Sequence, residues 1–335
     1  MTILTSGVSS TEAPLIFRGM RGEMVPHDEH PGRLGSILAG LGAIGTPTET
    51  TRVAQDSELA AVHDPGLIGF YREMASSAPE IRPTHPDSFP VRRTAPPPED
   101  LVGRFGYYCT GTQTPFVDSY WNDALRAAGC ALEGARLVVD GERSVYLACR
   151  PPGHHAGPDY FGGYCYLNNT ALAAEQLSQE GRVAILDVDY HHGNGTQDCF
   201  YDTDAVLTLS IHADTRFAYP HFYGSAEETG AGRGDGCNVN LPVPPNATTA
   251  AWFGALDEGL DRIADWQPDY LVEAFGADTY KDDPVGGFSL DIPDYETLGG
   301  RIMSLTLPTL VVQEGGYAVD ALGGIVASLL NGLGA

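Results

Sequence analysis

The chain has 335 residues, and its 44 acidic and 19 basic residues give a formal net charge of −25. No basic stripe is visible, so a nucleic-acid partner is not expected, and the same charge argues against binding to anionic membranes. An acidic protein could attract a cationic substrate, although solubility explains the charge at least as well.

One domain is expected over residues 1–335, because no linker rich in Ser, Pro or Gly divides the chain and no repeat is visible. The six cysteines lack paired spacing, and several lie in apolar runs, as reduced buried thiols do. Residues 1–7 do not resemble a signal peptide, and no apolar run approaches the ~18 residues of a membrane span. We therefore expect a soluble protein of the cytoplasm.

Segments with helical spacing of apolar residues alternate with short apolar runs that are typical of buried strands. Helices are expected over residues 31–41, 59–74 with a break at 64–66, 120–139, 168–177, 250–263, 295–305 and 321–330. Strands are expected over residues 145–149, 183–186, 205–211, 270–275 and 310–313. This alternation predicts an α/β fold whose mostly parallel sheet is covered by helices on both faces.

Four of these strands run directly into polar segments. The four segments contain, in chain order, the pair His154-His155, the run from Asp187 to Thr196, Asp278, and Tyr317. Ligands bind outside the carboxyl ends of the strands in open α/β sheets. We therefore expect these segments to form the rim of one pocket.

The run Asp187-Val188-Asp189-Tyr190-His191-His192-Gly193-Asn194-Gly195-Thr196 is the most informative part of the chain. Side chains alternate along a strand, so Asp187, Asp189 and His191 should project to one side. Two carboxylates and an imidazole favour a divalent-metal site, and Asp278 could be a third ligand beside Asp189 and His191. The simpler alternative, a polar strand end that caps the next helix, does not explain so many polar groups that need partners.

Tandem histidines after a strand favour acid–base chemistry over the surface exposure that is usual for a lone loop histidine. Asp187 could orient and stabilise one of the pair His154 and His155, whereas Asn194 offers the other only a neutral amide. Tyr317, on a Gly-Gly loop, could donate its hydroxyl to a developing oxyanion, although alone it would indicate only a turn.

These motifs resemble the histone deacetylase superfamily in content, order and spacing. The matching motifs are RPPGHHA at 150–156, FGGYCYLNN at 161–169, the run at 187–196, GADTY at 276–280 with Asp283-Pro284, EGGY at 314–317, EHPGR at 29–33 and VHD at 62–64. Within this superfamily the chain looks most like the bacterial acetylpolyamine amidohydrolases. The motifs that indicate this subgroup are SFPVRRT at 88–94, GYYC at 106–109, YPHF at 219–222 and AEETG at 226–230.

The resemblance implies an arginase–deacetylase fold, a single α/β domain around a parallel sheet of eight strands. It implies Zn²⁺, with Fe²⁺ as the alternative, on Asp189, His191 and Asp278, and a structural K⁺ near Asp187, Asp189, His191, Ser210 and Ile211. His155 would be the general base and then the general acid, and His154 with Asp187 would be its electrostatic partner. Asn194 would be a further catalytic residue. Tyr317 would polarise the acyl group, the Gly163 carbonyl would accept the amide N–H, and Tyr164 and Tyr219 would flank the substrate chain.

The resemblance also implies that residues of about 83–120 form a long loop that pairs two subunits in a homo-oligomer and narrows the active-site mouth. Two positions that are acidic in the subgroup align here with Gln113 and Val102, although Glu99 and Asp100 lie nearby. Acetylpolyamine is therefore in doubt as the substrate, but deacetylation is not. Glu273 stands where the family has an apolar residue, for which the sequence offers no physical account.

The expected function is zinc-dependent removal of an acetyl group from a small N-acetylated amine, such as an acetylpolyamine or an acetyl-lysine compound. A deacylase or esterase for another acyl group is the main alternative. A non-catalytic protein that binds acylated amines is disfavoured, because the set of reactive residues is complete. An arginase-like ureohydrolase needs a second metal, and only one clear ligand set is present.

Overall fold

An eight-stranded parallel sheet lies at the centre of the protein, in the order β4-β1-β5-β10-β9-β6-β7-β8. The computed structural model describes residues 1–335 except 8–16, 21–22, 43, 78–83 and 91–93. The strands of the sheet are β1 (Thr2–Thr5), β4 (Thr48–Glu49), β5 (Ser144–Ala148), β6 (Val183–Asp187), β7 (Val206–Ala213), β8 (Asn238–Val243), β9 (Tyr270–Phe275) and β10 (Thr309–Gln313). A separate antiparallel hairpin joins β2 (Phe17–Met20) to β3 (Glu23–Pro26).

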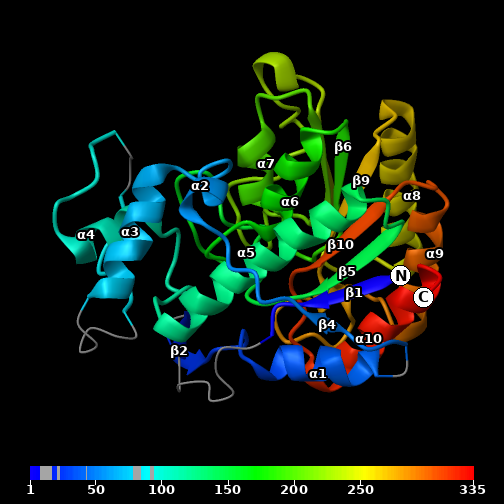
Figure 1. Ribbon diagram of the computed structural model, residues 1–335, viewed down its shortest axis with the longest axis horizontal. Helices are drawn as coiled ribbons and strands as arrows, with labels where there is room; N and C mark the ends of the chain where they lie inside the picture. The colour runs from blue at the N-terminus through cyan, green and yellow to red at the C-terminus, as the bar shows by residue number, and fades with distance from the viewer. Residues whose placement is uncertain (8–16, 21–22, 43, 78–83, 91–93) are drawn as a thin grey trace.

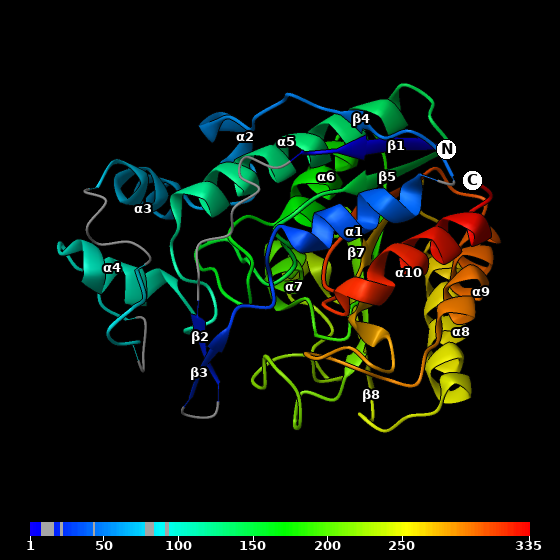
Figure 2. The ribbon, with the colours of Figure 1, turned by 90° about the horizontal axis from the view of Figure 1, so that it is seen from below.

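Helices cover both faces of the sheet, as predicted (Figure 1, Figure 2). One face packs against α5 (Asp118–Val139), α6 (Asn169–Ser178) and α7 (Asn194–Phe200). The other packs against α1 (Gly32–Leu41), α8 (Thr249–Trp266), α9 (Ile292–Met303) and α10 (Val319–Gly332). Three helices, α2 (Asp56–Leu59), α3 (Pro65–Ser76) and α4 (Leu101–Tyr108), lie beyond one end of the sheet, on the left in Figure 1.

The central strands are mostly apolar because both of their faces are buried. Along β5, Val145 and Leu147 belong to the cluster that faces α5, whereas Tyr146 and Ala148 belong to the cluster that faces α1 and α10. This two-residue alternation is the ordinary geometry of a strand. It turns the uninterrupted apolar runs of the sequence into two separate hydrophobic cores.

All the predicted strands and most of the predicted helices are present, but some elements were not anticipated. These are the hairpin, β1, β4, β8, α4 and α7. The strands β1 and β4 are very short, and β8 buries Asn238 and Asn240. None of the three therefore gives a long apolar run. The break predicted at 64–66 is present, because the side chain of Asp64 accepts a hydrogen bond from the Gly66 N–H and starts α3 at Pro65. The helix before the break, α2, already ends at Leu59.

Within the segment from 83 to 120, α4 and the first turn of α5 are helical, whereas residues 83 and 91–93 lie outside the described part. All six cysteines are free thiols, with Cys109, Cys130, Cys149 and Cys165 buried and Cys199 and Cys237 half-buried. No helix in the described part is both long enough and apolar enough to cross a membrane.

Glu273 is buried in the core with no hydrogen-bond partner for either carboxylate oxygen among the described residues. It pairs in register with Leu186 of β6 and Val311 of β10, so its side chain points into the same apolar cluster as theirs. Burial away from water disfavours the charged form and raises the pKa of Glu273 to about 8.

We predict that this carboxyl makes folding stability fall as the pH rises between about 4.5 and 8, because the folded state keeps a proton that the unfolded state has lost. This effect amounts to about 1.4 kcal/mol for each pH unit in that window. The variant Glu273→Gln, which does not titrate, should gain stability over the wild type as the pH rises from 5.5 to 8. Urea unfolding at both values tests this, and an equal difference at both pH values would refute it.

Candidate active site

The polar segments that follow β5, β6, β9 and β10 converge at the carboxyl edge of the sheet, as predicted. The Nδ1 atom of His191 lies 3.2 Å from Oδ1 of Asp189 and 3.0 Å from Oδ2 of Asp278. All three residues are buried, and one ligand atom from each lies within 4.8 Å of the others. Two carboxylates and one imidazole suit a catalytic zinc site, which leaves coordination positions open.

The strand β6 ends at Asp187, but hydrogen bonds extend its two-residue spacing to Asp189 and His191. The Asp187 carboxylate accepts the Asp189 N–H at 3.1 Å, and the Asp189 carboxylate accepts the His191 N–H at 2.8 Å. Such bonds, from a carboxylate to a backbone N–H two residues later, are typical of Asx turns. The predicted convergence of the three side chains is therefore present, although turns and not a strand hold the last two.

Without a cation this cluster is electrostatically unfavourable. Burial and the neighbouring Asp189 carboxylate raise the pKa of Asp278 to about 7. A second group of possible ligands, formed by His154, Cys165 and Glu314, fits a metal less well. The Glu314 carboxylate already accepts bonds from the Gly153 N–H at 2.5 Å and the Thr170 hydroxyl at 2.7 Å. The residues present therefore fit one divalent ion, held by Asp189, His191 and Asp278.

The two tandem histidines have different partners, as the sequence predicted. His154 Nδ1 lies 3.0 Å from Asp187 Oδ2, and His155 Nδ1 lies 2.7 Å from Asn194 Oδ1. Burial alone would lower the pKa of His154, but the Asp189 and Asp187 carboxylates raise it well above its usual value. Burial and the neighbouring histidines His154 and His191 lower the pKa of His155 well below its usual value. The site therefore pairs a cationic imidazole with a neutral one.

The loop that carries Tyr317 is held through its backbone from two sides. The Arg33 Nε donates to the Gly316 carbonyl at 2.6 Å, and its guanidinium lies 4.6 Å from the centre of the Tyr317 ring. From the other side, Asp283 Oδ2 accepts the N–H groups of Tyr317 at 2.6 Å and Ala318 at 2.9 Å. These contacts fix the direction of the Tyr317 side chain.

Arg33 belongs to a buried ionic cluster. Glu29 accepts from Arg33 at 3.1 Å and from Arg150 at 2.5 Å, and Arg150 also donates to Asp123 at 2.6 Å. No role was predicted for Arg33, Glu29 or Asp283 from the sequence, although all three lie in the matching motifs. The sequence did contain a sign that Arg33 is buried, because it lies on the apolar face of the helix predicted over residues 31–41.

A cavity of about 530 Å³, which we call the catalytic channel, reaches His191 of the cluster formed by Asp189, His191 and Asp278. Its lining includes the predicted site residues His154, His155, Gly163, Tyr164, His191, Tyr219 and Tyr317, together with Gln113. Gly163 has a positive φ of 54°, and an added Cβ would lie 2.4 Å from the His155 ring, so only glycine fits. Glu99, Asp100 and Val102 do not line the channel, and Asp100 instead caps α4 by accepting the Gly103 N–H at 2.8 Å.

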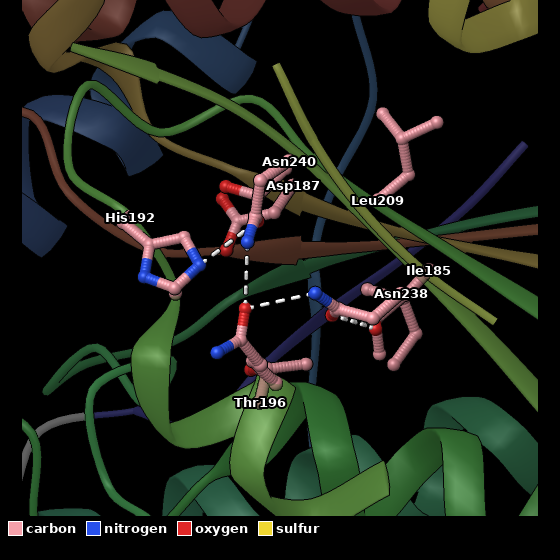
Figure 3. A pocket seen from close by; sticks show the side chains of 11 residues that line it. Ile185, Asp187, His192, Thr196, Leu209, Asn238 and Asn240 are labelled. Carbon is pink, nitrogen blue, oxygen red and sulfur yellow. Dashed lines mark hydrogen bonds between the residues drawn. The ribbon is translucent and has the colours of Figure 1, made fainter. Parts of the chain in front are cut away.

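A second cavity, of about 10 Å³, lies between α7 and the strands β6, β7 and β8, with room for one water molecule or ion. Figure 3 shows the side chains of Asp187, Asn238 and Asn240 around it. Of the residues predicted to hold potassium, Asp187 and Ser210 line this cavity and pair in register, whereas Asp189, His191 and Ile211 do not line it.

Comparison with known proteins agrees with this architecture. Residues 27–333 match the model of the histone deacetylase domain, and the chain belongs to this family. It is 43% identical to acetylpolyamine amidohydrolase 1 of Pseudomonas aeruginosa over 93% of this chain and 92% of that protein. It is 42% identical to acetylpolyamine amidohydrolase of Mycoplana ramosa over 93% of this chain and 94% of that protein. The crystal structure of acetylpolyamine aminohydrolase from Burkholderia pseudomallei has a TM-score of 0.92 at 35% identity and covers 100% of this chain and 99% of its own.

The different partners of the two histidines lead to a prediction for the metal-free protein. His154 should remain protonated well above pH 6.5, whereas His155 should remain neutral well below it. The variant Asp187→Asn should lower the pKa of His154, because it removes one of the two carboxylates that stabilise the cation. NMR titration of the imidazole resonances measures both values. Equal pKa values for the two histidines would contradict this description of the site.

Proposed function

We propose that this protein is a zinc-dependent hydrolase that removes an acetyl group from a small N-acetylated amine. One observation carries the proposal: Asp189, His191 and Asp278 form a buried ligand set, and His191 of this set lines the same channel as His155 and Tyr317. The names of the relatives, which are amidohydrolases of acetylpolyamines, support the same reaction class. Loss of one of these residues would leave a binding protein, but the set is complete.

The metal would be held by Asp189, His191 and Asp278, with Zn²⁺ as the first choice and Fe²⁺ as the alternative. When bound, such an ion polarises a carbonyl group and lowers the pKa of a coordinated water molecule. The small cavity beside Asp187 and Ser210 supports a structural K⁺ that would offset the charge of the buried carboxylate. We also infer that residues of about 83–120 contribute to a homodimer or a larger homo-oligomer.

His155 is the residue that moves protons in this mechanism. Its lowered pKa leaves an imidazole nitrogen free to accept a proton from the attacking water as the new C–O bond forms. Asn194, at 2.7 Å from Nδ1, fixes the ring so that the other nitrogen faces the channel. His155 then gives the proton to the departing nitrogen as the C–N bond breaks, and acetate and the free amine result.

Tyr317 and His154 provide the electrostatic support. Burial raises the pKa of Tyr317 well above its usual value, so its hydroxyl keeps its proton and can donate a hydrogen bond to the oxygen on which charge develops. His154, held as a cation by Asp187 and Asp189, adds a fixed positive charge beside His155. The Gly163 carbonyl would accept the amide N–H of the substrate, and Tyr164 and Tyr219 would flank its chain.

A deacetylation assay of the zinc-loaded protein tests the proposal, with N-acetylputrescine, N-acetylcadaverine and an acetyl-lysine peptide compared under the same conditions. Release of acetate from any of them supports an amidohydrolase, and the order of kcat/KM identifies the preferred amine. Activity on none of them, with activity on longer acyl chains or on esters, would favour a deacylase or esterase.

We predict that His155→Ala lowers kcat by at least about 100-fold, because it removes the group that accepts and returns the proton. The bound metal should remain, since His155 is not one of the three ligands. Steady-state kinetics and metal analysis on the same sample check both points. His30→Ala, at a histidine outside the channel lining, is the control with unchanged turnover. Residual activity above a few per cent in His155→Ala would exclude this role.

We predict that Asp278→Asn weakens zinc binding by more than about 100-fold, because even residues behind the ligands change metal affinity by 10- to 100-fold. A competition titration against a chromophoric chelator measures the affinity without reference to activity. Asp282→Asn is the matched control, because Asp282 is close in sequence but exposed. Equal affinities in the two variants would place the metal elsewhere.

A further inference from the structure

We propose that a further, larger cavity beside the catalytic channel binds an uncharged aromatic group at the far end of the substrate. This aromatic annex has a volume of about 740 Å³. It is lined by residues 89–90, 107–113 and 219–223, together with Tyr160 and Asn194. The inference rests on the proposed function and adds the chemical class of the amine to it.

The annex is continuous with the catalytic channel. Gln113, Tyr219 and His221 line both cavities. The Tyr219 ring lies edge-on to the His155 ring, with 4.8 Å between their centres. A substrate whose acetamide lies beside His155 can therefore extend past Tyr219 into the annex.

The lining of the annex is rich in aromatic side chains. Aromatic side chains come from each of its three segments: Phe89, Tyr107, Tyr108, Tyr219, Phe222 and Tyr223. Neither a carboxylate nor a lysine or arginine lies among the described lining residues. Nearby acids have other partners: Asp198 accepts from the Tyr160 hydroxyl at 2.6 Å, and Glu228 accepts from Gln197 Nε2 at 2.6 Å.

This lining favours an aromatic group over the ammonium group of a polyamine. A cation–π contact at an exposed site returns only about 0.5–1 kcal/mol, and no carboxylate among the described lining residues would add to it. An aromatic group would instead stack on or meet the edges of the rings that line the annex. In the single chain much of this apolar surface is uncovered, since Phe222 is 91% exposed and Phe89 is 41% exposed. Covering it gives a direct hydrophobic gain.

No carboxylate, lysine or arginine lines the junction between the two cavities either. Gln113, which lines both, presents an amide, and its Oε1 is buried with no hydrogen-bond partner among the described residues. An unpaired buried acceptor is costly, so this side chain gains a bond if it turns toward an N–H of the substrate. An N-acetylated diamine whose second nitrogen forms an aromatic amide provides both that N–H and the ring.

The test compares two substrates that have the same reacting arm, N-acetylputrescine and N-acetyl-N′-benzoylputrescine. We expect kcat/KM for acetyl removal to be at least about tenfold higher for the benzoyl compound, mainly through a lower KM. Phe222→Ala and Tyr107→Ala should reduce this preference to less than about threefold. Phe217→Ala is the matched control, because Phe217 is 70% exposed and lines the channel but not the annex, so it should affect both substrates alike.

A binding measurement separates this inference from the proposed function. Calorimetric titration of the His155→Ala protein with N-benzoylputrescine and with putrescine needs no turnover. Tighter binding of the benzoyl compound, lost in Phe222→Ala, supports the annex even if no acetylated amine is hydrolysed. In that case the proposed function fails and the binding site remains.

Three outcomes would overturn the inference. The first is an equal or higher kcat/KM for N-acetylputrescine. The second is an equal effect of Phe222→Ala and Tyr107→Ala on both substrates. The third is an unchanged preference in Phe222→Ala together with a smaller assembly by light scattering, which would show that Phe222 contacts another copy of the chain.

Discussion

The arrangement of the site depends on negative charge that is buried at one edge of the sheet. Asp187, Asp189, Asp278 and Glu314 are all buried, and an unpaired buried carboxylate is very costly. Each is compensated by N–H groups from a neighbouring segment: Asp189 accepts the Gly315 N–H at 2.9 Å, and Asp278 accepts the Tyr190 N–H at 2.9 Å. The carboxylates therefore connect the loops after four different strands, so that the groups that would bind a metal also hold the edge of the sheet together.

Buried charged groups also hold the loop that carries Tyr317, and here one is positive and one is negative. Arg33 bonds to carbonyl groups of the loop, with its Nη2 2.6 Å from the Glu314 carbonyl, and Asp283 accepts N–H groups of that loop. Because these bonds go to the backbone, they fix the loop regardless of its side chains, and a Gly-Gly sequence can be used there without loss of order. Both glycines are required for other reasons: Gly316 has a φ of 117°, and a Cβ added at Gly315 would lie 2.5 Å from carboxylate oxygens of Asp189 and Asp278.

The sequence predicted the parts of the site that depend on local order. Asp187, Asp189 and His191 follow an apolar run at a two-residue spacing, which the Asx turns after the end of β6 preserve. The Arg33 contacts lie beyond such reasoning, because its partners Glu314 and Gly316 follow 281 and 283 residues later. The short edge strand β4 and the partly polar β8 were missed because neighbouring strands and not apolar composition define them. For Glu273 the structure shows apolar surroundings but no partner among the described residues, so it does not explain this residue either.

The position of Glu29 has a consequence for the order in which the protein forms during synthesis. Its partner Arg150 follows 121 residues later, and β1 lies beside β5 as the second strand from one edge of the sheet. The strand β1 therefore has no neighbour on this side until the residues between Thr5 and Ser144 have been made. Contacts between residues so far apart in sequence slow folding and prolong the exposure of unpaired strands. The strand β1 thus pairs with β5 late, although it is made before the other strands of the sheet.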